Sequence, residues 1–309
     1  MKLITICFIF AITTIFSIEN PKTFLVFGGK TGWIGQKVVK LLQDQNHHVH
    51  CANSRLENRE SIQKEIENIC PDFIINCAGI TGNPNVDWCE DHQIETVRTN
   101  IIGVLTLVDI AHVNNIHVTN FGTGCIYEYN ETHPMNSGIG FSEEDPPNFS
   151  GSFYSYIKGI FEKFIPLYPN LLNLRLRMPI SSDLHPKNFI TKITKYNKVI
   201  NIPNSMSILD DLLPAAIDMT LRKVKGNFNF VNPGVISHNE VLDLYTQYID
   251  PNFKYKNFTI EEQNIILKAK RSNNELNTNK LLNECPYILP IQEAIKKTFQ
   301  QMEASLSKS

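Results

Sequence analysis

The sequence has few of the features that mark metal-binding, disulfide-linked or nucleic-acid-binding proteins. Its 7 cysteines are scattered, and no two of them form a C-x-x-C pair, so we expect neither a metal site nor a disulfide framework. Lysine and arginine total 29 against 31 aspartate and glutamate residues, without a basic block. The charge pattern gives no case for a nucleic-acid partner, and unpaired cysteines favour a reducing compartment.

Long hydrophobic runs are absent except at the amino terminus. Residues 3–18 are uncharged and mostly apolar, which is short for a membrane-spanning helix and suits a signal peptide or an anchor. Against export, an acceptor motif for N-glycosylation at Asn148 lies close to Tyr154 in the sequence. We therefore expect a cytoplasmic protein, with membrane tethering or a signal through residues 3–18 as the alternative.

Beyond this segment, buried-strand and amphipathic-helix patterns alternate along the chain. Strands are expected at 23–29, 48–53, 73–79, 117–124, 171–177, 198–202 and 227–231. Helices are expected at 34–45, 58–70, 94–114, 188–196, 209–223, 237–249, 259–268 and 275–284, with one more around Tyr154 and Lys158.

The alternation predicts an α/β fold, a Rossmann-type doubly wound parallel sheet. After Met178 it loosens, which predicts a smaller carboxyl-terminal lobe that binds substrate over the sheet edge. We expect an apolar extension over 1–20, a nucleotide-binding domain over 21–178, and a mainly substrate-binding lobe over 179–309 that is interleaved with it.

A glycine motif, G-x-x-G-x-x-G, follows the first predicted strand and opens a helix. Its glycines let the backbone approach a pyrophosphate, and the helix amino terminus supplies N–H donors. Cofactor contacts are expected from Gly29, Thr31, Gly32, Trp33, Ile34 and Gly35.

The end of the second predicted strand favours NADPH over NADH. NAD sites usually place an acidic residue there for the ribose 2′-hydroxyl, but no acid lies between Asp44 and Glu57. Ser54 and Arg55 stand there instead, and an arginine pairs well with a 2′-phosphate. The alternative is that Arg55 is an ordinary solvated residue.

Further cofactor contacts are expected beyond the third predicted strand. Ala78 and Gly79 are small enough to let the cofactor lie close to the backbone, and Asn100 sits in the long helix that follows. Read alone, Asn100 could equally be a helix-packing residue.

Tyr154 and Lys158 are four residues apart on a predicted helix and so share a face. An adjacent ammonium should lower the pKa of the tyrosine hydroxyl, which could then exchange a proton with a carbonyl oxygen while a nicotinamide moves a hydride. Thr123, at the end of a predicted strand, would position that oxygen. This set predicts a dehydrogenase active site in which Tyr154 and Lys158 also bind the cofactor.

These motifs together resemble the extended short-chain dehydrogenases that act on nucleotide sugars. Longer segments look very like one family within that group, the UDP-4-keto-6-deoxy-D-glucose 3,5-epimerase/4-reductases, which include the carboxyl-terminal half of plant rhamnose synthase. The segments are TGNPNVDWCE (81–90), SGIGFSEEDPPNFSGSFYS (137–155), RMPISSDL (177–184), NFITKI (188–193), IPNSMSILD (202–210), NPGVISHNE (232–240) and RSNNEL (271–276). The resemblance covers roughly residues 23–300.

The resemblance implies conversion of UDP-4-keto-6-deoxy-D-glucose to UDP-L-rhamnose. A 4-keto group acidifies the protons on C3 and C5, and Cys125 and Lys192 would be the acid/base partners that invert these centres. A buried inert thiol and a solvated lysine are the alternatives for these residues. Tyr154 would then protonate the C4 oxygen during reduction.

Substrate contacts follow from the same segments. Asn85, Trp88 and Asn188 are candidates for the sugar or uracil, and Arg177 and Arg271 for the diphosphate, although either arginine could be a structural ion-pair partner. A separate 4,6-dehydratase would supply the substrate, and the resemblance suggests a homodimer. The remaining alternatives are a reductase without epimerase activity and a non-catalytic NADP-binding regulatory subunit.

Overall fold

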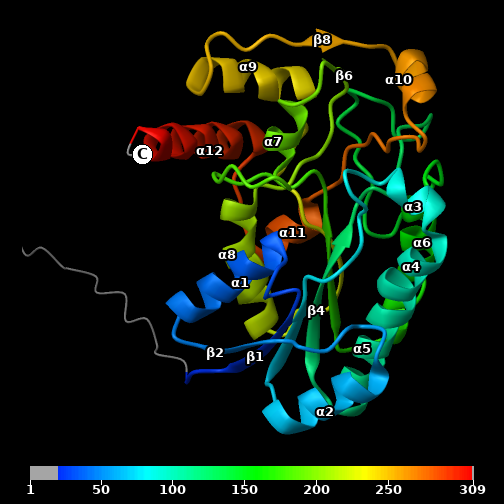
Figure 1. Ribbon diagram of the computed structural model, residues 1–309, viewed down its shortest axis with the longest axis vertical. Helices are drawn as coiled ribbons and strands as arrows, with labels where there is room; N and C mark the ends of the chain where they lie inside the picture. Colours follow the sequence, from blue (N-terminus) through cyan, green and yellow to red (C-terminus); the bar gives the residue numbers. More distant parts are fainter. Residues whose placement is uncertain (1–19, 308–309) are drawn as a thin grey trace, which may run out of the picture.

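A parallel sheet of six strands forms the centre of the protein (Figure 1). The structure is a computed structural model that describes residues 20–307. In their spatial order the strands are β2 (His48–Cys51), β1 (Thr23–Phe27), β3 (Phe73–Asn76), β4 (His117–Thr123), β5 (Leu171–Leu176) and β7 (Gly226–Asn229). The strand order reverses between β1 and β3, and ligands bind at such switch points. The predicted doubly wound fold is confirmed.

Helices cover both faces of this sheet because successive strand residues point to opposite sides. Phe24 and Val26 of β1 pack with α1 (Trp33–Asp44), α8 (Leu209–Leu221) and α11 (Asn279–Glu284). Leu25 and Phe27 pack on the other side, with the helices α2 (Arg59–Ile69), α5 (Val104–Val113) and α6 (Phe153–Glu162). Burial on both faces makes β1 and most of β3 continuously apolar, which is why the sequence pattern identified them.

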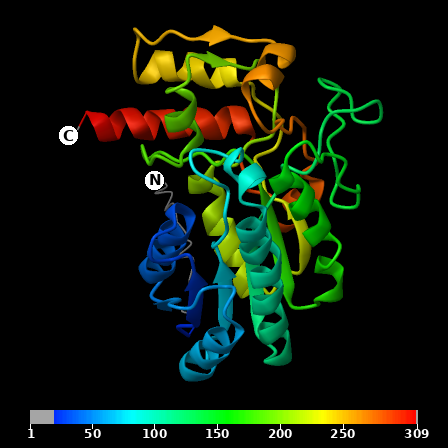
Figure 2. The ribbon, with the colours of Figure 1, turned by 45° about the vertical axis from the view of Figure 1, so that its right-hand side comes forward.

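The second body lies beyond the carboxyl ends of the strands (Figures 1 and 2). Its separate apolar core joins α7 (Phe189–Ile193), α9 (His238–Tyr248) and α12 (Ile291–Leu306). A short parallel pair, β6 (Lys198–Val199) and β8 (Lys256–Asn257), and α10 (Ile260–Ile266) lie at its edge. Because α8 and β7 return to the main sheet, the chain beyond residue 178 contributes to both bodies.

Several elements differ from those expected. The helix predicted over 94–114 is divided into α4 (Gln93–Val97), a π-helical segment η1 (Arg98–Gly103) and α5, and is preceded by the short α3 (Trp88–Asp91). A turn of 3-10 helix, η2 (Ile165–Leu167), follows α6, and α12 was not predicted at all. The helix expected from residue 275 begins only at Asn279, because Leu276 forms a bridge with Phe141.

No helix within residues 20–307 is long and apolar enough to cross a membrane. The apolar segment at 3–18 lies outside the described residues.

Candidate active site

The glycine turn after β1 is closely packed on its own backbone. Gly28 has a φ of +78°, and its carbonyl accepts a hydrogen bond from the Gly32 N–H at 3.0 Å. A Cβ at Gly32 or Gly35 would lie 2.6 or 2.2 Å from that oxygen, so neither position tolerates a side chain. No side chain caps the start of α1, and no acidic residue lies in its first turn. The N–H groups there suit a phosphate anion.

Trp33, the first residue of α1, uses its side chain for something other than the expected cofactor contact. Its indole N–H donates to the Asp183 carboxylate at 3.0 Å, and its ring stacks on His185 with centroids 5.3 Å apart. Lys37 of α1 pairs with the same carboxylate at 2.7 Å. Asp183, which sequence reasoning missed, therefore fastens the start of α1, beside the glycine turn, to the segment after β5.

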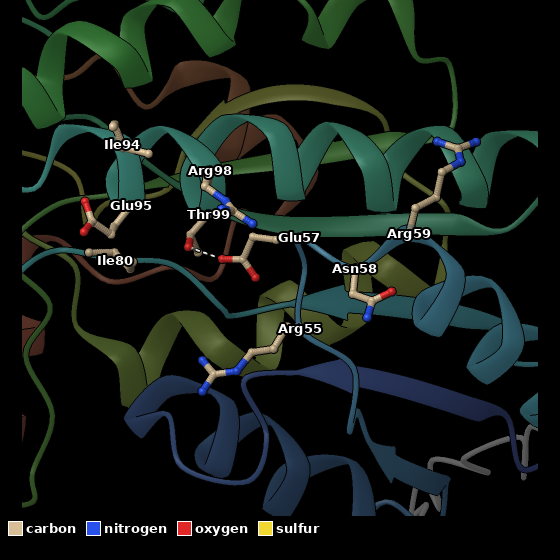
Figure 3. A pocket seen from close by; sticks show the side chains of 9 residues that line it. All are labelled: Arg55, Glu57, Asn58, Arg59, Ile80, Ile94, Glu95, Arg98 and Thr99. Carbon is tan, nitrogen blue, oxygen red and sulfur yellow. Dashed lines mark hydrogen bonds between the residues drawn. The ribbon is translucent and has the colours of Figure 1, made fainter.

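An open cavity of about 740 Å³ lies beside the end of β2 (Figure 3). Its lining residues are Arg55, Glu57, Asn58, Arg59, Ile80, Ile94, Glu95, Arg98 and Thr99. Arg55 projects into it from one side, and on the other Glu57 and Thr99 are hydrogen-bonded to each other (Figure 3). Within residues 20–307 no ion pair involves Arg55, so its charge is available to a ligand.

The turn that carries Ser54 and Arg55 is held by Glu65 of α2. Its carboxylate accepts from the backbone N–H groups of Asn53 at 2.7 Å and Ser54 at 3.0 Å. Lys30 of the glycine turn contacts the Asn53 side chain, which brings a second cation to this strand end. Lys30 and Glu65 were not singled out from the sequence; the position of Lys30 inside the glycine motif was the available signal.

Asn100 holds the chain just beyond β3. Its side chain accepts from the Ile80 N–H at 3.0 Å and donates to the Ile80 carbonyl at 2.8 Å, and the residue is fully buried. Both polar ends are thus engaged by protein, and the direct cofactor contact of this side chain stays a prediction. A Cβ at Gly79 would lie 3.2 Å from the Asn100 amide oxygen, so Asn100 places Ala78 and Gly79 at the strand end.

Tyr154 and Lys158 lie on α6, which Ser152 caps through the Ser155 N–H at 3.1 Å. Thr123 at the end of β4 and the thiol of Cys125 lie close enough to the Tyr154 hydroxyl to influence it. Thr123 also accepts from the Cys125 N–H at 3.0 Å. The structure thus brings the predicted Thr123, Cys125 and Tyr154 together.

Both members of the predicted catalytic pair are buried, with Tyr154 8% and Lys158 7% exposed. Burial raises the pKa of Tyr154, with a further rise from Cys125 and a smaller lowering from Thr123. The expected lowering by Lys158 is therefore wrong for this structure, because the cost of burying a phenolate dominates. Burial also lowers the pKa of Lys158 to about 8, against an opposing influence of Glu162.

Lys192 lies half-buried on α7, beyond the sheet edge (Figure 1). Burial lowers its pKa, and Lys187 lowers it further. Asn188 is the amino-terminal cap of this helix: it accepts from the Ile190 N–H at 3.2 Å and donates to the Ser181 carbonyl at 2.7 Å. Asn188 is fully buried and positions the helix that carries Lys192, while its substrate contact stays a prediction.

Arg177 cannot be a diphosphate clamp. It is 1% exposed, and its guanidinium donates to the carbonyls of Gly124, Ser205 and Ser272, to the Ser272 hydroxyl and to the Asn204 amide oxygen. Every N–H is occupied, so that prediction is wrong. Arg271 remains a candidate: its side chain is 25% exposed and pairs with Asp87 at 2.8 Å through one nitrogen.

The loop with Asn85 and Trp88 is anchored to the segment around Arg271. The Asn85 side chain accepts from the Asp87 N–H at 2.8 Å, and Trp88 stacks on His92 with centroids 3.8 Å apart. Asp87 also accepts from the Ala269 N–H at 3.1 Å. Asn85, Trp88 and Arg271 therefore lie on joined segments.

Residues 25–175 match the NAD dependent epimerase/dehydratase family. The chain is 53% identical over 282 residues to the bifunctional dTDP-4-dehydrorhamnose 3,5-epimerase/dTDP-4-dehydrorhamnose reductase of Arabidopsis thaliana, covering 91% of this chain and 93% of that relative. It is 52% identical to a trifunctional UDP-glucose 4,6-dehydratase/UDP-4-keto-6-deoxy-D-glucose 3,5-epimerase/UDP-4-keto-L-rhamnose-reductase of the same plant, over 90% of this chain and 42% of that protein. The crystal structure of the L780 UDP-rhamnose synthase from Acanthamoeba polyphaga mimivirus matches with a TM-score of 0.88 and 41% identity, over 92% of this chain and 100% of that one.

Proposed function

Since the chain belongs to the NAD-dependent epimerase/dehydratase family, we propose that it is an NADPH-dependent 3,5-epimerase/4-reductase that converts UDP-4-keto-6-deoxy-D-glucose to UDP-L-rhamnose. The observation that carries the proposal is the contact of Thr123 with Tyr154, with Cys125 beside them. A dehydrogenase needs the first two residues, whereas the thiol is an addition that suits proton transfer at carbon. The names of the relatives point to the same pair of activities.

NADPH as the cofactor is supported by the cations at the end of β2. Arg55 is exposed to the cavity there, Lys30 reaches the same turn, and the carboxylate of Glu65 is engaged with backbone N–H groups. This arrangement favours a 2′-phosphate over a free 2′-hydroxyl. The uncapped start of α1 would hold the pyrophosphate.

Reduction requires a proton donor at the C4 oxygen, and the raised pKa of Tyr154 keeps this hydroxyl protonated at neutral pH. Thr123 orients the oxygen, and Tyr154 gives up its proton as the carbonyl becomes an alkoxide. When bound, NADPH would supply the hydride. A protonated Lys158 stabilises the tyrosinate that remains.

Epimerisation at C3 and C5 precedes this step, because only a 4-keto sugar has acidic protons at these carbons. Removing such a proton leaves an enolate, and returning a proton to the opposite face inverts the centre. We assign these transfers to Cys125 and Lys192; the lowered pKa of Lys192 makes its neutral amine more accessible. Cys125 follows the end of β4, and Lys192 lies on α7.

We also propose that the chain acts in the cytoplasm as a homodimer on a sugar supplied by a separate 4,6-dehydratase. Exposed apolar side chains support self-association: Ile94, Ile102 and Val113 along α4 to α5, and Tyr156 on the neighbouring α6. Burying such a stripe against a second copy would remove it from water.

Incubation with UDP-4-keto-6-deoxy-D-glucose and NADPH in D2O tests the proposal. We expect UDP-L-rhamnose carrying deuterium at C3 and C5, and slower turnover of the dTDP and GDP analogues. Absence of turnover with any UDP sugar would refute the function.

Cys125→Ala separates the two activities. We expect it to lose deuterium uptake at C3 and C5 while still reducing a pre-epimerised 4-keto sugar. Thr123→Ala is the matched control, because it should impair reduction itself. Unchanged deuterium uptake in the Cys125 variant would leave a reductase whose thiol has no part in epimerisation.

A further inference from the structure

A row of buried asparagines crosses the main sheet on the side that α6 covers. Asn76, Asn120 and Asn173 are register partners on β3, β4 and β5. The Asn76 amide donates to the Asn120 oxygen at 2.8 Å, and the Asn120 amide donates to the Asn173 oxygen at 2.7 Å. At its start, the Asn76 oxygen accepts from the Ala78 N–H at 3.1 Å. The row thus begins at the strand end where cofactor contacts are expected.

From Asn173 the row continues to Asn227 on β7, at 2.8 Å, and to Glu162 on α6, one turn beyond Lys158. The Asn173 amide donates to one carboxylate oxygen at 3.2 Å, and Arg175 donates to the other at 2.7 Å. The Glu162 and Arg175 side chains are 7% and 2% exposed. An arginine only donates, so the carboxylate is the terminal acceptor and the direction of every hydrogen bond in the row is fixed.

Lys158 has no ion-pair partner among residues 20–307. Its ammonium lies 5.9 Å from the centre of the Phe161 ring. Burial lowers its pKa to about 8, and Glu162 is the one charged group that acts on it. The other titratable groups on elements beside α6 are Cys89, Glu90 and Asp91 on α3, Glu95 on α4, Arg98 on η1, Cys125 after β4 and Arg175 on β5.

We propose that Glu162 is a positioning residue for the reduction. Its two oxygens tie the catalytic helix to the asparagine row and to Arg175, which sets the position of Tyr154 and Lys158 relative to the end of β3. Its negative charge, held one turn from Lys158, favours the ammonium form that attracts an anionic cofactor and stabilises the tyrosinate left after proton transfer. The inference rests on the proposed function in one respect, which is that the step assisted by Glu162 is the reduction at C4.

The test measures hydride transfer and NADPH binding as functions of pH in the full chain. For Glu162→Gln we expect the alkaline limb of kcat/KM to move to lower pH by about one unit, from the loss of a nearby charge in a buried site. NADPH binding should weaken over the same shifted range. Glu162→Asp should return the limb toward that of the unaltered protein, because it keeps the charge.

The matched control is Glu143→Gln, because Glu143 also lies near Arg175 but acts on neither catalytic side chain. It should leave the pH profile unchanged. Glu162→Gln leaves Arg175 buried without its partner and could fail to fold. The double variant Glu162→Gln with Arg175→Met removes both charges, and its alkaline limb should coincide with that of Glu162→Gln, because Arg175 does not act on Lys158.

If the alkaline limb of kcat/KM is unshifted in both Glu162→Gln and the double variant, the inference is wrong. This holds even if the protein turns over the sugar fully and the proposed function stands. If the pH dependence of NADPH binding shifts but no 4-keto sugar is turned over, the result would support the positioning role of Glu162 and refute the proposed substrate.

Discussion

Arg55 and Arg59 line the same cavity and differ in their partners. Arg59 pairs with Asp109 at 2.7 Å, whereas no ion pair involves Arg55 in the described part of the chain. A charge-assisted hydrogen bond is worth about 1.5–3 kcal/mol, so Arg55→Ala should weaken NADPH binding about 10- to 100-fold. NADH binding should change little. Fluorescence titration with both cofactors measures the effect.

Arg59→Ala is the control for this prediction, since its guanidinium is already engaged with a carboxylate. It should leave the ratio of NADPH to NADH affinity unchanged. An equal loss of both affinities in Arg55→Ala would mean that Arg55 shapes the cavity without recognising the 2′-phosphate.

At the scale of single residues, the sequence predicts chemistry better than it predicts exposure. Thr123, Cys125 and Tyr154 were expected together and are found together. Arg177 was expected in the substrate site but is enclosed by carbonyl and amide oxygens from three separate segments. Those oxygens converge only after folding, and no local pattern records them.

Helix α7 depends on Asn188, which caps it and also binds the preceding loop. Removing an amino-terminal cap typically costs about 1 kcal/mol, with up to about 2 in proteins. We expect Asn188→Ala to reduce the free energy of unfolding by about this amount. Because α7 carries Lys192, deuterium uptake at C3 and C5 should slow more than hydride transfer to a pre-epimerised sugar.

A cap elsewhere in the second body provides the comparison. Thr259 caps α10 through the Glu262 N–H at 3.2 Å, and this short helix carries none of the predicted site residues. Thr259→Ala should cost similar stability in urea unfolding and leave both reactions unchanged. If both reactions slow equally in the Asn188 variant, α7 has no special part in epimerisation.

At the scale of elements, the sequence reveals a helix when the residues that determine it lie within the helix itself. The α12 helix was missed although Ile291, Ile295 and Phe299 form one apolar face, so a usable signal was present. The π-helical η1 had no such signal. Asn100 within it reaches back to the chain beyond β3, a contact that its own segment does not reveal.

At the scale of the whole molecule, the alternating pattern was sufficient for the main sheet because each of its inner strands is buried on both faces. The pattern did not place β7 beside β5, since Asn227 and Asn229 give that strand a polar face. Asn227 accepts from Asn173 at 2.8 Å and thereby joins the asparagine row. Hydrogen bonds between buried amide side chains thus help to hold this edge strand beside β5, and an apolar sequence pattern cannot predict them.

Acid stability of the whole fold should depend on two buried histidines, His117 at the start of β4 and His238 at the start of α9. Burial lowers the pKa of each from 6.5 to about 4. Between these values the unfolded chain binds more protons than the folded one, so stability falls as pH falls from about 6.5 to about 4. Each histidine contributes up to about 3 kcal/mol to this loss.

His117→Leu removes the contribution of one of the two histidines to the loss of stability at acid pH. His117 lies at the amino end of β4, far along the strand from Thr123 at its carboxyl end. Its Nε2 is buried without a hydrogen-bond partner, so the substitution removes a titrating group without breaking a hydrogen bond at that atom. We expect a shallower decline of the urea midpoint from about pH 6.5 to about pH 4, whereas leucine at the exposed His48 should leave the decline unchanged. An equally steep decline in His117→Leu would mean that His117 has no part in the acid sensitivity and would leave His238 as its source. Carboxylates such as Glu65 and Asp183 have lowered pKa values, so their loss of stability falls at more acidic pH than this range.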